Sequence, residues 1–305
     1  TKDSPVKIAT GAAGELHYAD IFTPDVTGQN YLVARNGTEL FLAVHTHKWT
    51  YTANDKTKTI SATCNECNQN GGSVTLKAPE GTLTYTGEDQ PATYEGSIST
   101  GDTPTIDYLK QGKYGLETLE NGALPKNANT YTATLHAGDE SVSVNYTINK
   151  ADLTVKAKDA TIVYGDTASD KGVTYSGFVN GENESVLGGE LTYIFSYTPG
   201  MDKGLYIITP EGKTSGNYDI TFTPGTLTVT QRTVTLTWHN YENRTYGDGK
   251  YVYATAGSLL EADAGKVQVN VMGNGAQVSG KYTATAFKLT GDKADNYKLP
   301  ENATK

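Results

Sequence analysis

The sequence predicts an all-β protein with three sandwich-like domains in tandem, arranged as an extended rod and preceded by a small β-hairpin module. Three observations lead to this prediction. The composition suits strands, since the 305 residues include 21 Tyr and only 2 Met, and aromatic and β-branched side chains favour the half-buried surface of a sheet. Apolar residues alternate with polar ones along many segments. One ordered set of motifs also recurs about every eighty residues.

The recurring motifs are three tyrosine landmarks that follow one another in the same order. The first is a tyrosine that ends a strand just before a turn glycine, at Tyr85, Tyr164 and Tyr246. The second is a tyrosine strand with a polar approach, at Tyr131, Tyr206 and Tyr282. The third, in the last two units only, is an Asn-Tyr pair that ends in Tyr218 and Tyr297. A period this long exceeds a solenoid turn and indicates small sandwich domains in a row.

Alternation locates individual strands within these units. Apolar residues occupy every second position in residues 142–148, 227–230 and 234–238, which places them on one face of a strand and threonines on the other. The linkers 148–153 and 229–234 run from the last strand of one unit almost directly into the first strand of the next. Such short linkers restrict rotation between neighbouring domains, which is why we expect a semi-rigid rod.

Several segments resemble a known repeat family. Residues 151–155, 164–166, 175–178, 217–218 and 225–229 together resemble the mostly-β "MBG" repeats of bacterial surface proteins, and residues 232–236 with 246–250 resemble a related repeat. Residues 73–148 are similar to the Ig-like Tyr-Asp-Gly repeats of the same proteins, although Thr86 stands where that triplet has Asp. The resemblance implies secreted or wall-attached proteins in which such repeats form stalks and adhesive surfaces. It implies no catalytic residues.

We therefore expect five segments. Residues 1–44 form a partial N-terminal β segment with short strands at 21–24 and 31–34 and a buried strand at 40–44. The others are a His/Cys hairpin module (45–71), an Ig-like repeat (72–149), an MBG-type repeat (150–230) and a second MBG-type repeat (231–305). The last repeat lacks a counterpart of residues 225–229, so we expect its final strand to be missing and the chain to be a piece of a longer protein.

One group of residues has the chemistry of a metal site. His45 and His47 are two positions apart, and a predicted hairpin brings them beside the pair Cys64 and Cys67. Two imidazoles and two thiolates form a closed tetrahedral set for structural zinc. The segment also resembles those that precede repeats of this kind, which often read Cys-x-His-x-Trp…Cys-x-x-Cys. The resemblance maps His47, Trp49, Cys64 and Cys67 onto that pattern, with His45 in place of the first Cys. A Cys64–Cys67 disulfide and two free thiols are the alternatives, and four protein ligands leave no open position for catalysis.

Other candidate sites have simpler structural explanations. Trp238 is a candidate sugar platform, but it alternates in phase with Val234 and Leu236, which favours a core position. Asp166 and Asp248 follow Tyr-Gly turns, where capping explains a carboxylate better than calcium binding does.

Two further histidines, His17 and His136, are isolated in the sequence, so we expect surface or packing roles for them.

Charge and hydropathy limit the partners. The formal net charge of -9 argues against nucleic acid, because phosphate binding requires a basic surface. The longest apolar runs are far shorter than a membrane span. We expect a monomeric segment of a longer chain, located outside the cell at a bacterial surface or cell wall, with host protein or glycan as the candidate partners.

The leading functional hypothesis is a non-enzymatic structural or adhesive stalk segment of a bacterial surface protein. The alternative is an accessory or carbohydrate-binding region of a large secreted polysaccharide-degrading enzyme. A ligand assay on the isolated chain and the domains encoded beside it discriminate between the two.

Overall fold

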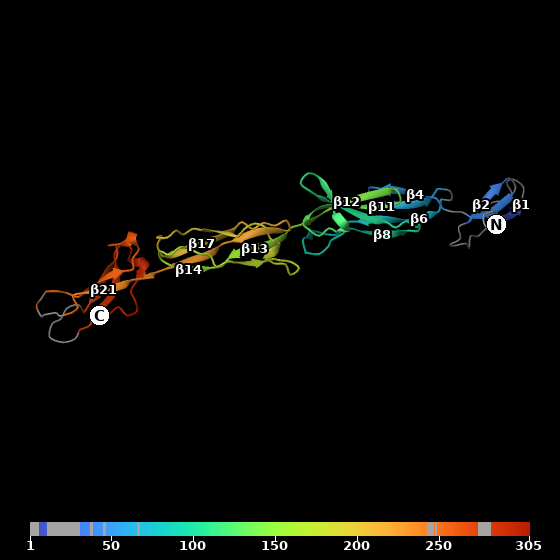
Figure 1. The fold of residues 1–305 in the computed structure, drawn as a ribbon. Helices are drawn as coiled ribbons and strands as arrows, with labels where there is room; N and C mark the ends of the chain where they lie inside the picture. The colour runs from blue at the N-terminus through green and yellow to red at the C-terminus, as the bar shows by residue number, and fades with distance from the viewer. Residues whose placement is uncertain are drawn as a thin grey trace. The chain divides into compact units, whose positions relative to one another are not determined.

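The computed structural model describes residues 6–10, 31–36, 39–44, 47–65, 68–242, 247, 249–273 and 282–305. These residues form strands connected by turns and four short 3-10 helices, so the predicted all-β fold class is confirmed. The chain divides into two compact units, Thr1–Asn149 and Lys150–Lys305 (Figure 1). Among the described residues, no helix has the length and apolar character needed to cross a bilayer.

The first unit begins with a three-stranded antiparallel sheet in the order β1-β3-β2. Its strands are β1 (Val6–Thr10), β2 (Tyr31–Asn36) and β3 (Glu39–Val44). The apolar run that the sequence predicted as a strand is β3, which pairs on both sides. The predicted strand at 21–24 lies outside the described residues.

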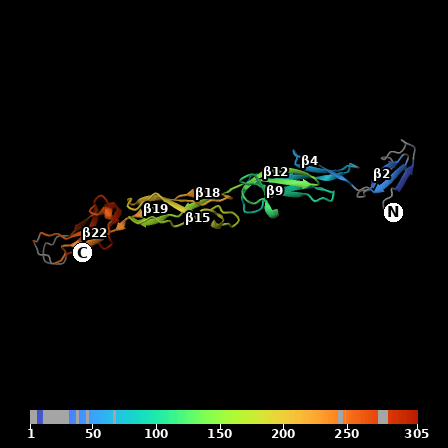
Figure 2. The same cartoon turned by 45° about the horizontal axis from the view of Figure 1, so that its top comes forward.

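The rest of the first unit is a sandwich of two sheets (Figure 2). One sheet has the order β4-β5-β6-β8 and consists of β4 (Trp49–Asn54), β5 (Thr59–Cys64), β6 (Asn70–Lys77) and β8 (Thr93–Ile98). The other has the order β10-β9-β11-β12-β7 and consists of β7 (Leu83–Thr84), β9 (Thr105–Gln111), β10 (Leu116–Thr118), β11 (Asn129–Ala137) and β12 (Glu140–Asn149). Side chains such as Ile60, Val74 and Leu135 are completely buried between the two sheets.

This arrangement corrects the predicted hairpin module at 45–71. The hairpin of β4 and β5 is not a separate module, because β5 also pairs with β6, and β6 pairs with β8. The predicted boundary at residue 72 falls inside β6. The hairpin instead supplies one half of a sheet that covers the core of the first sandwich.

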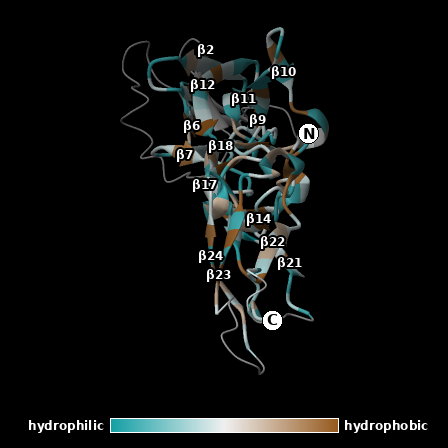
Figure 3. Cartoon of the chain, turned by 90° about the vertical axis from the view of Figure 1, so that its left-hand side faces the viewer, coloured by the Kyte–Doolittle hydropathy of each residue, from teal (hydrophilic) through white to brown (hydrophobic). Residues whose placement is uncertain are grey.

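The second repeat occupies the first half of the second unit and is a sandwich of a three-stranded and a four-stranded sheet. The first sheet, β15-β13-β18, consists of β13 (Ala151–Ala157), β15 (Val173–Ser176) and β18 (Tyr218–Thr223). The second, β14-β19-β17-β16, consists of β14 (Ala160–Val163), β16 (Thr192–Phe195), β17 (Gly204–Glu211) and β19 (Gly225–Thr230). In Figure 3 short hydrophobic and hydrophilic stretches alternate along the strands, as expected for sheets with one buried face.

The described part of the third repeat consists of three two-stranded sheets, β20-β25, β21-β22 and β23-β24, whose pairings are shorter than those of the second repeat. Its strands are β20 (Arg232–Thr233), β21 (Thr235–His239), β22 (Tyr253–Gly257), β23 (Gln268–Met272), β24 (Thr285–Thr290) and β25 (Tyr297–Lys298). β20 pairs in parallel with β25, as β13 does with β18 in the second repeat.

We expected the closing strand of the third repeat to be missing, but residues 303–305 pair as such a strand does. Residues 303–305 pair with the chain just before and within β24, through a Thr285–Thr304 bridge and a hydrogen bond from Ala286 N to Ala303 O of 2.8 Å. They take the place beside β24 that β19 has beside β17. The expectation is corrected for these residues.

The second tyrosine landmark is a tyrosine corner. The Tyr131 hydroxyl donates to the carbonyl oxygen of Asn127 at 2.8 Å, and the Tyr206 hydroxyl donates to that of Asp202 at 2.6 Å. Both acceptors lie four residues upstream. A phenol that ties a strand to its own approach in this way is a hallmark of Ig-like sandwiches. The recurrence of this tyrosine therefore has a structural cause in both units.

Candidate functional site

The predicted metal site is only partly within the described residues. His45 and Cys67 lie outside them. Cys64 is completely buried and lies opposite Trp49 in the β4–β5 pair. His47 is half-buried, and its ring centroid lies 4.8 Å from that of Trp49. Two of the four proposed ligands are therefore at the same end of the hairpin.

The burial of Cys64 also has a second explanation. Cys64 alternates in phase with Ile60 and Ala62, which are both completely buried core residues of β5. A cysteine at this position packs as a small apolar side chain without any ligand. Within the described part of the chain, no group of three or more potential metal ligands is present. The zinc site therefore stays a prediction.

Trp238 takes the structural role that we favoured, whereas Asp166 has a structural contact other than the predicted turn cap. Trp238 is half-buried in phase with Val234 and Leu236. Asp166 accepts a hydrogen bond from Arg232 Nη2 at 2.6 Å.

Of the two isolated histidines, His136 is described and forms a contact with one surface carboxylate. Nε2 of His136 lies 3.4 Å from Oδ2 of the exposed Asp107. His17 and Asp248 lie outside the described residues.

The most elaborate polar cluster of the second unit lies at the joint between the second and third repeats. The last strand of the second repeat ends at Thr230 and the first strand of the third begins at Arg232, so Gln231 alone separates them. The Gln231 side-chain amide donates to the carbonyl oxygens of Asp295 at 3.0 Å and Tyr297 at 2.8 Å. The linker is thereby tied to the third repeat within the 3-10 helix η4 (Ala294–Asn296) and at the residue that follows it.

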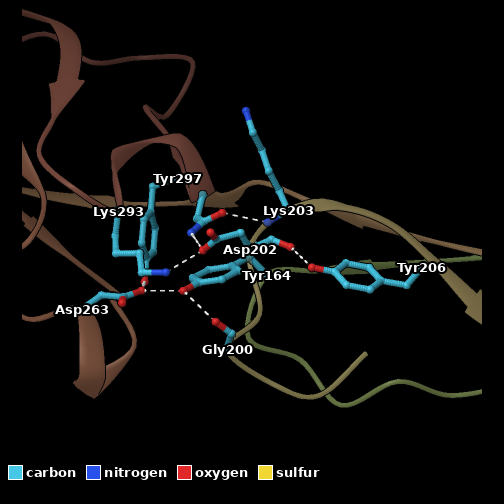
Figure 4. A network of polar contacts seen from close by, with 9 residues as sticks. Tyr164, Gly200, Asp202, Lys203, Tyr206, Asp263, Lys293 and Tyr297 are labelled. Carbon is cyan, nitrogen blue, oxygen red and sulfur yellow. Dashed lines mark hydrogen bonds and ion pairs between the residues drawn. The ribbon is translucent and has the colours of Figure 1, made fainter. Parts of the chain in front are cut away.

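Asp263 is the centre of this joint. Its side chain belongs to the third repeat and only 2% of the residue is exposed. Its Oδ2 atom accepts hydrogen bonds from the hydroxyls of Tyr164 of the second repeat at 2.9 Å and Tyr297 of the third at 2.8 Å (Figure 4). The two tyrosine rings meet edge to face, with centroids 5.4 Å apart. A buried carboxylate is stable only with such donors, so the contact is specific for the paired repeats.

The joint shifts the titration of both tyrosines. Burial raises the pKa of Tyr297 to about 12, and the hydrogen bond to the Asp263 carboxylate adds to this rise. Burial, followed by the same carboxylate, raises the pKa of Tyr164 as well. Ionising either phenol would place a second negative charge beside Asp263 in a dry site. Both hydroxyls are therefore held as neutral donors.

A second layer of polar contacts surrounds this centre. Asp202 Oδ1, from the second repeat, accepts hydrogen bonds from Lys293 Nζ at 2.6 Å and Asn296 Nδ2 at 2.7 Å (Figure 4). The hydrogen bond from Lys293 lowers the pKa of the Asp202 carboxyl. Asn296 is almost completely buried, and its Oδ1 accepts from Lys203 N at 2.7 Å. Arg232 Nε donates to the carbonyl oxygen of Tyr164 at 2.7 Å.

The apolar core is also continuous across the joint. Buried side chains of both repeats form one cluster, which contains Ala157, Ala160, Tyr164, Tyr197, Ile208, Leu227 and Val229 of the second repeat and Val234, Val267 and Tyr297 of the third. Half-buried leucines of the third repeat, including Leu259 and Leu260, pack against it. The second and third repeats are therefore one packed body rather than two independent domains.

Each tyrosine of the third landmark, Tyr218 and Tyr297, donates a hydrogen bond to a carboxylate of its own repeat. Tyr297 OH accepts from Leu260 N at 2.9 Å and donates to Asp263, three residues further on. In the second repeat, Tyr218 OH accepts from Val179 N at 3.1 Å and donates to Glu182, which is again three residues further on. Asp263 and Glu182 were not predicted from the sequence. Aligning the repeats on the third landmark would have shown an acidic residue at nearly the same distance before each tyrosine.

One family matches part of the chain. Residues 153–228 match the family described as MBG domain (YGX type). The resemblance proposed for the second repeat is therefore confirmed, and this segment is an MBG-type, mostly-β domain. No curated protein matches the chain.

Solved structures with tandem β domains resemble the chain distantly. The N-terminal four Ig domains of Dscam1 isoform 4.44 share 10% identity at a TM-score of 0.29, over 67% of this chain and 61% of that one. The three N-terminal domains of the bacteriophage RB49 Highly Immunogenic Outer Capsid protein share 12% at 0.21, over 66% and 88%. Drosophila N-cadherin EC1-4 shares 12% at 0.22, over 87% of both chains. The chain thus spans less than two thirds of the Dscam1 structure, and likenesses at these TM-scores carry no argument about function.

Proposed function

We propose that the chain is a non-enzymatic structural or adhesive stalk segment of a secreted or cell-wall-attached bacterial surface protein. The observation that carries this proposal is the joint between the second and third repeats. A single linker residue, a shared core and a buried carboxylate that accepts from both repeats fix their relative orientation. A segment whose task is to hold a binding surface at a distance needs joints of this kind.

The proposal is tested by residual dipolar couplings of backbone amides in the full chain. One alignment tensor should fit the second and third repeats together, because their contacts leave no hinge between them. Two different tensors for these repeats would mean that the joint does not hold them, and the stalk function would lose its main support.

The alternative is an accessory or carbohydrate-binding region of a secreted polysaccharide-degrading enzyme. One observation favours it: on the third repeat, the exposed Tyr253 stacks on His239 with ring centroids 4.6 Å apart, and Tyr251 nearby is also exposed. Aromatic rings at a surface suit the C–H faces of sugars. A glycan array with the chain decides between the functions, since binding of a polysaccharide fragment above background that Tyr253→Ala and Tyr251→Ala remove would favour the alternative.

We also propose that His45, His47, Cys64 and Cys67 bind a structural zinc ion. The donor set fits zinc. The backbone also turns tightly after the first cysteine, since Asn68 N donates to Cys64 O and Cys64 N donates to Gln69 O, both at 2.9 Å. When bound, the metal would cross-link the end of the β4–β5 hairpin.

Metal analysis of the purified chain tests the zinc proposal. We expect about one zinc per chain, as a four-ligand site binds a single ion. Cys67→Ser should remove the metal, and His136→Ala, which changes a half-buried histidine of the same unit, should keep it. A Cys64–Cys67 disulfide in the mass spectrum would refute the site.

A further inference from the structure

The strand β16 forms an edge of the sheet β14-β19-β17-β16. Its four residues alternate, so that Ile194 points outward and is 55% exposed while Tyr193 and Phe195 are half-buried on the inner face. The ring centroids of Tyr193 and Phe195 lie 6.4 Å apart, and both rings pack at the margin of the shared core. β16 therefore has one face directed to the core and one face directed to solvent, as strands of antiparallel sheets commonly do.

One side of β16 is satisfied by β17. Ser196 N donates to Ile207 O at 3.0 Å, so Ser196 and Ile194, which have the same parity, direct their backbone groups toward β17. The backbone groups of Tyr193 and Phe195 point to the opposite side, where no strand of the described residues pairs with β16.

The edge is short, but it lacks the side chains that usually oppose association. Natural edge strands carry a lysine, a proline or a bulge that blocks pairing. The segment Thr192–Phe195 contains no charged residue and no proline, and its register with β17 is regular. The neighbouring strand adds Leu205 and Ile207 to the same outer face, 75% and 53% exposed. An aliphatic surface thus borders an open edge.

We propose that β16 of one chain pairs antiparallel with β16 of a second copy of this chain, about a two-fold axis at Ile194. In this register Tyr193 exchanges backbone hydrogen bonds with Phe195 of the second copy, and the outward Ile194 side chains face each other. Opposite residues then share a face, as an antiparallel pair requires. Tyr193 also gains a cross-strand aromatic neighbour, which stabilises such pairs.

The two-fold arrangement is also free of charge conflict at its centre. Glu211, which pairs with Thr192 at one end of the strand, lies at opposite ends of the joined sheet in the two copies. The joined sheet extends the aliphatic face of Ile194, Leu205 and Ile207 across both chains. This self-association goes beyond the proposed function, since a stalk segment can present a distant surface without pairing with itself.

Sedimentation equilibrium of the full chain in the presence of reductant tests this proposal. We expect a concentration-dependent monomer–dimer equilibrium. Ile194→Lys, which places like charges on the axis, should shift dimerisation to at least tenfold higher concentration. The matched control is Met272→Lys in the third repeat, since Met272 is also 55% exposed, and it should leave the equilibrium unchanged.

A charge-reversal experiment tests the register itself. Mixing the Ile194→Lys and Ile194→Glu chains should restore the dimer at concentrations where each chain alone is monomeric, because only the proposed axis places position 194 opposite itself. A chain that stays monomeric at every concentration, a Met272→Lys effect equal to that of Ile194→Lys, or a mixture that remains monomeric would each overturn the proposal.

Discussion

Replacing Asp263 by alanine is expected to lower the free energy of unfolding of the second unit by about 3 kcal/mol. The carboxylate accepts hydrogen bonds from two buried phenols, one from each repeat. Its removal leaves both hydroxyls without their acceptor in a dry site, and each unsatisfied buried donor costs roughly 1–3 kcal/mol. The change also opens a small cavity in the joint between the repeats.

The measurement uses the tryptophan fluorescence of the chain during urea unfolding. The chain has 2 Trp, of which Trp238 lies in the third repeat and Trp49 in the first unit. A Trp49→Phe background therefore reports the second unit alone. The matched control is Glu261→Ala, because Glu261 is an exposed carboxylate of the same short 3-10 helix. Equal midpoints for Asp263→Ala and the control would show that the buried carboxylate does not stabilise the joint.

A double-mutant cycle separates the two repeats. Tyr164→Phe removes a hydroxyl of the second repeat, yet Trp238 should detect the loss, about 1 kcal/mol for one hydrogen bond, because the two repeats share one core. In the Asp263→Ala background the same substitution should have a much smaller effect, since its partner is already absent. Independent unfolding of the repeats would leave the Trp238 transition unchanged by Tyr164→Phe.

Much of the strand pattern could be predicted from local sequence. The alternation in residues 142–148 lies within β12, and that in residues 234–238 is largely β21. Several of the tyrosine landmarks marked buried positions, since Tyr131, Tyr218 and Tyr297 are all in the core, although Tyr282 is 46% exposed. Both signals succeed because they report which face of a strand is buried, and this depends on near neighbours in the chain.

The predicted boundary between residues 71 and 72 was wrong because it falls inside β6, between Gly71 and Gly72. The register shifts at this point, and a Cβ atom on Gly71 would come within 2.8 Å of the Trp49 ring. These glycines mark a bulge and a close packing contact within one sheet. No local pattern distinguishes this use from a linker.

The joint could not be predicted for a different reason. Asp263 looks like any surface carboxylate in a chain with 34 acidic residues. Its two donors lie 99 residues before it and 34 residues after it. Only the packing of one repeat on the next brings these three groups together, so short-range periodicity contains no signal for them. The repeat order itself, compared unit against unit, is the information that would have identified the carboxylate.

Raising the pH above about 10 is expected to destabilise the second unit steeply. An unfolded tyrosine titrates near pH 10, whereas burial raises the pKa of Tyr297 to about 12 and also raises that of Tyr164. The folded state therefore keeps protons that the unfolded state loses. The stabilisation is fully present below pH 10 and is lost as the pH rises toward the folded pKa values, by about 1.4 kcal/mol per pH unit for each of the two tyrosines.

The slope of stability against pH identifies the groups responsible. Urea unfolding followed by Trp238 between pH 8 and about pH 12 should give a slope that Tyr297→Phe reduces by the equivalent of one proton. Tyr253→Phe is the control, since this tyrosine of the third repeat is exposed and stacks on His239. The hydroxyl of Tyr297 donates to Asp263, so ionisation of this phenol would place two negative charges in one buried contact. An unchanged slope in Tyr297→Phe would place the alkaline sensitivity of the second unit elsewhere and would deny the joint its electrostatic role.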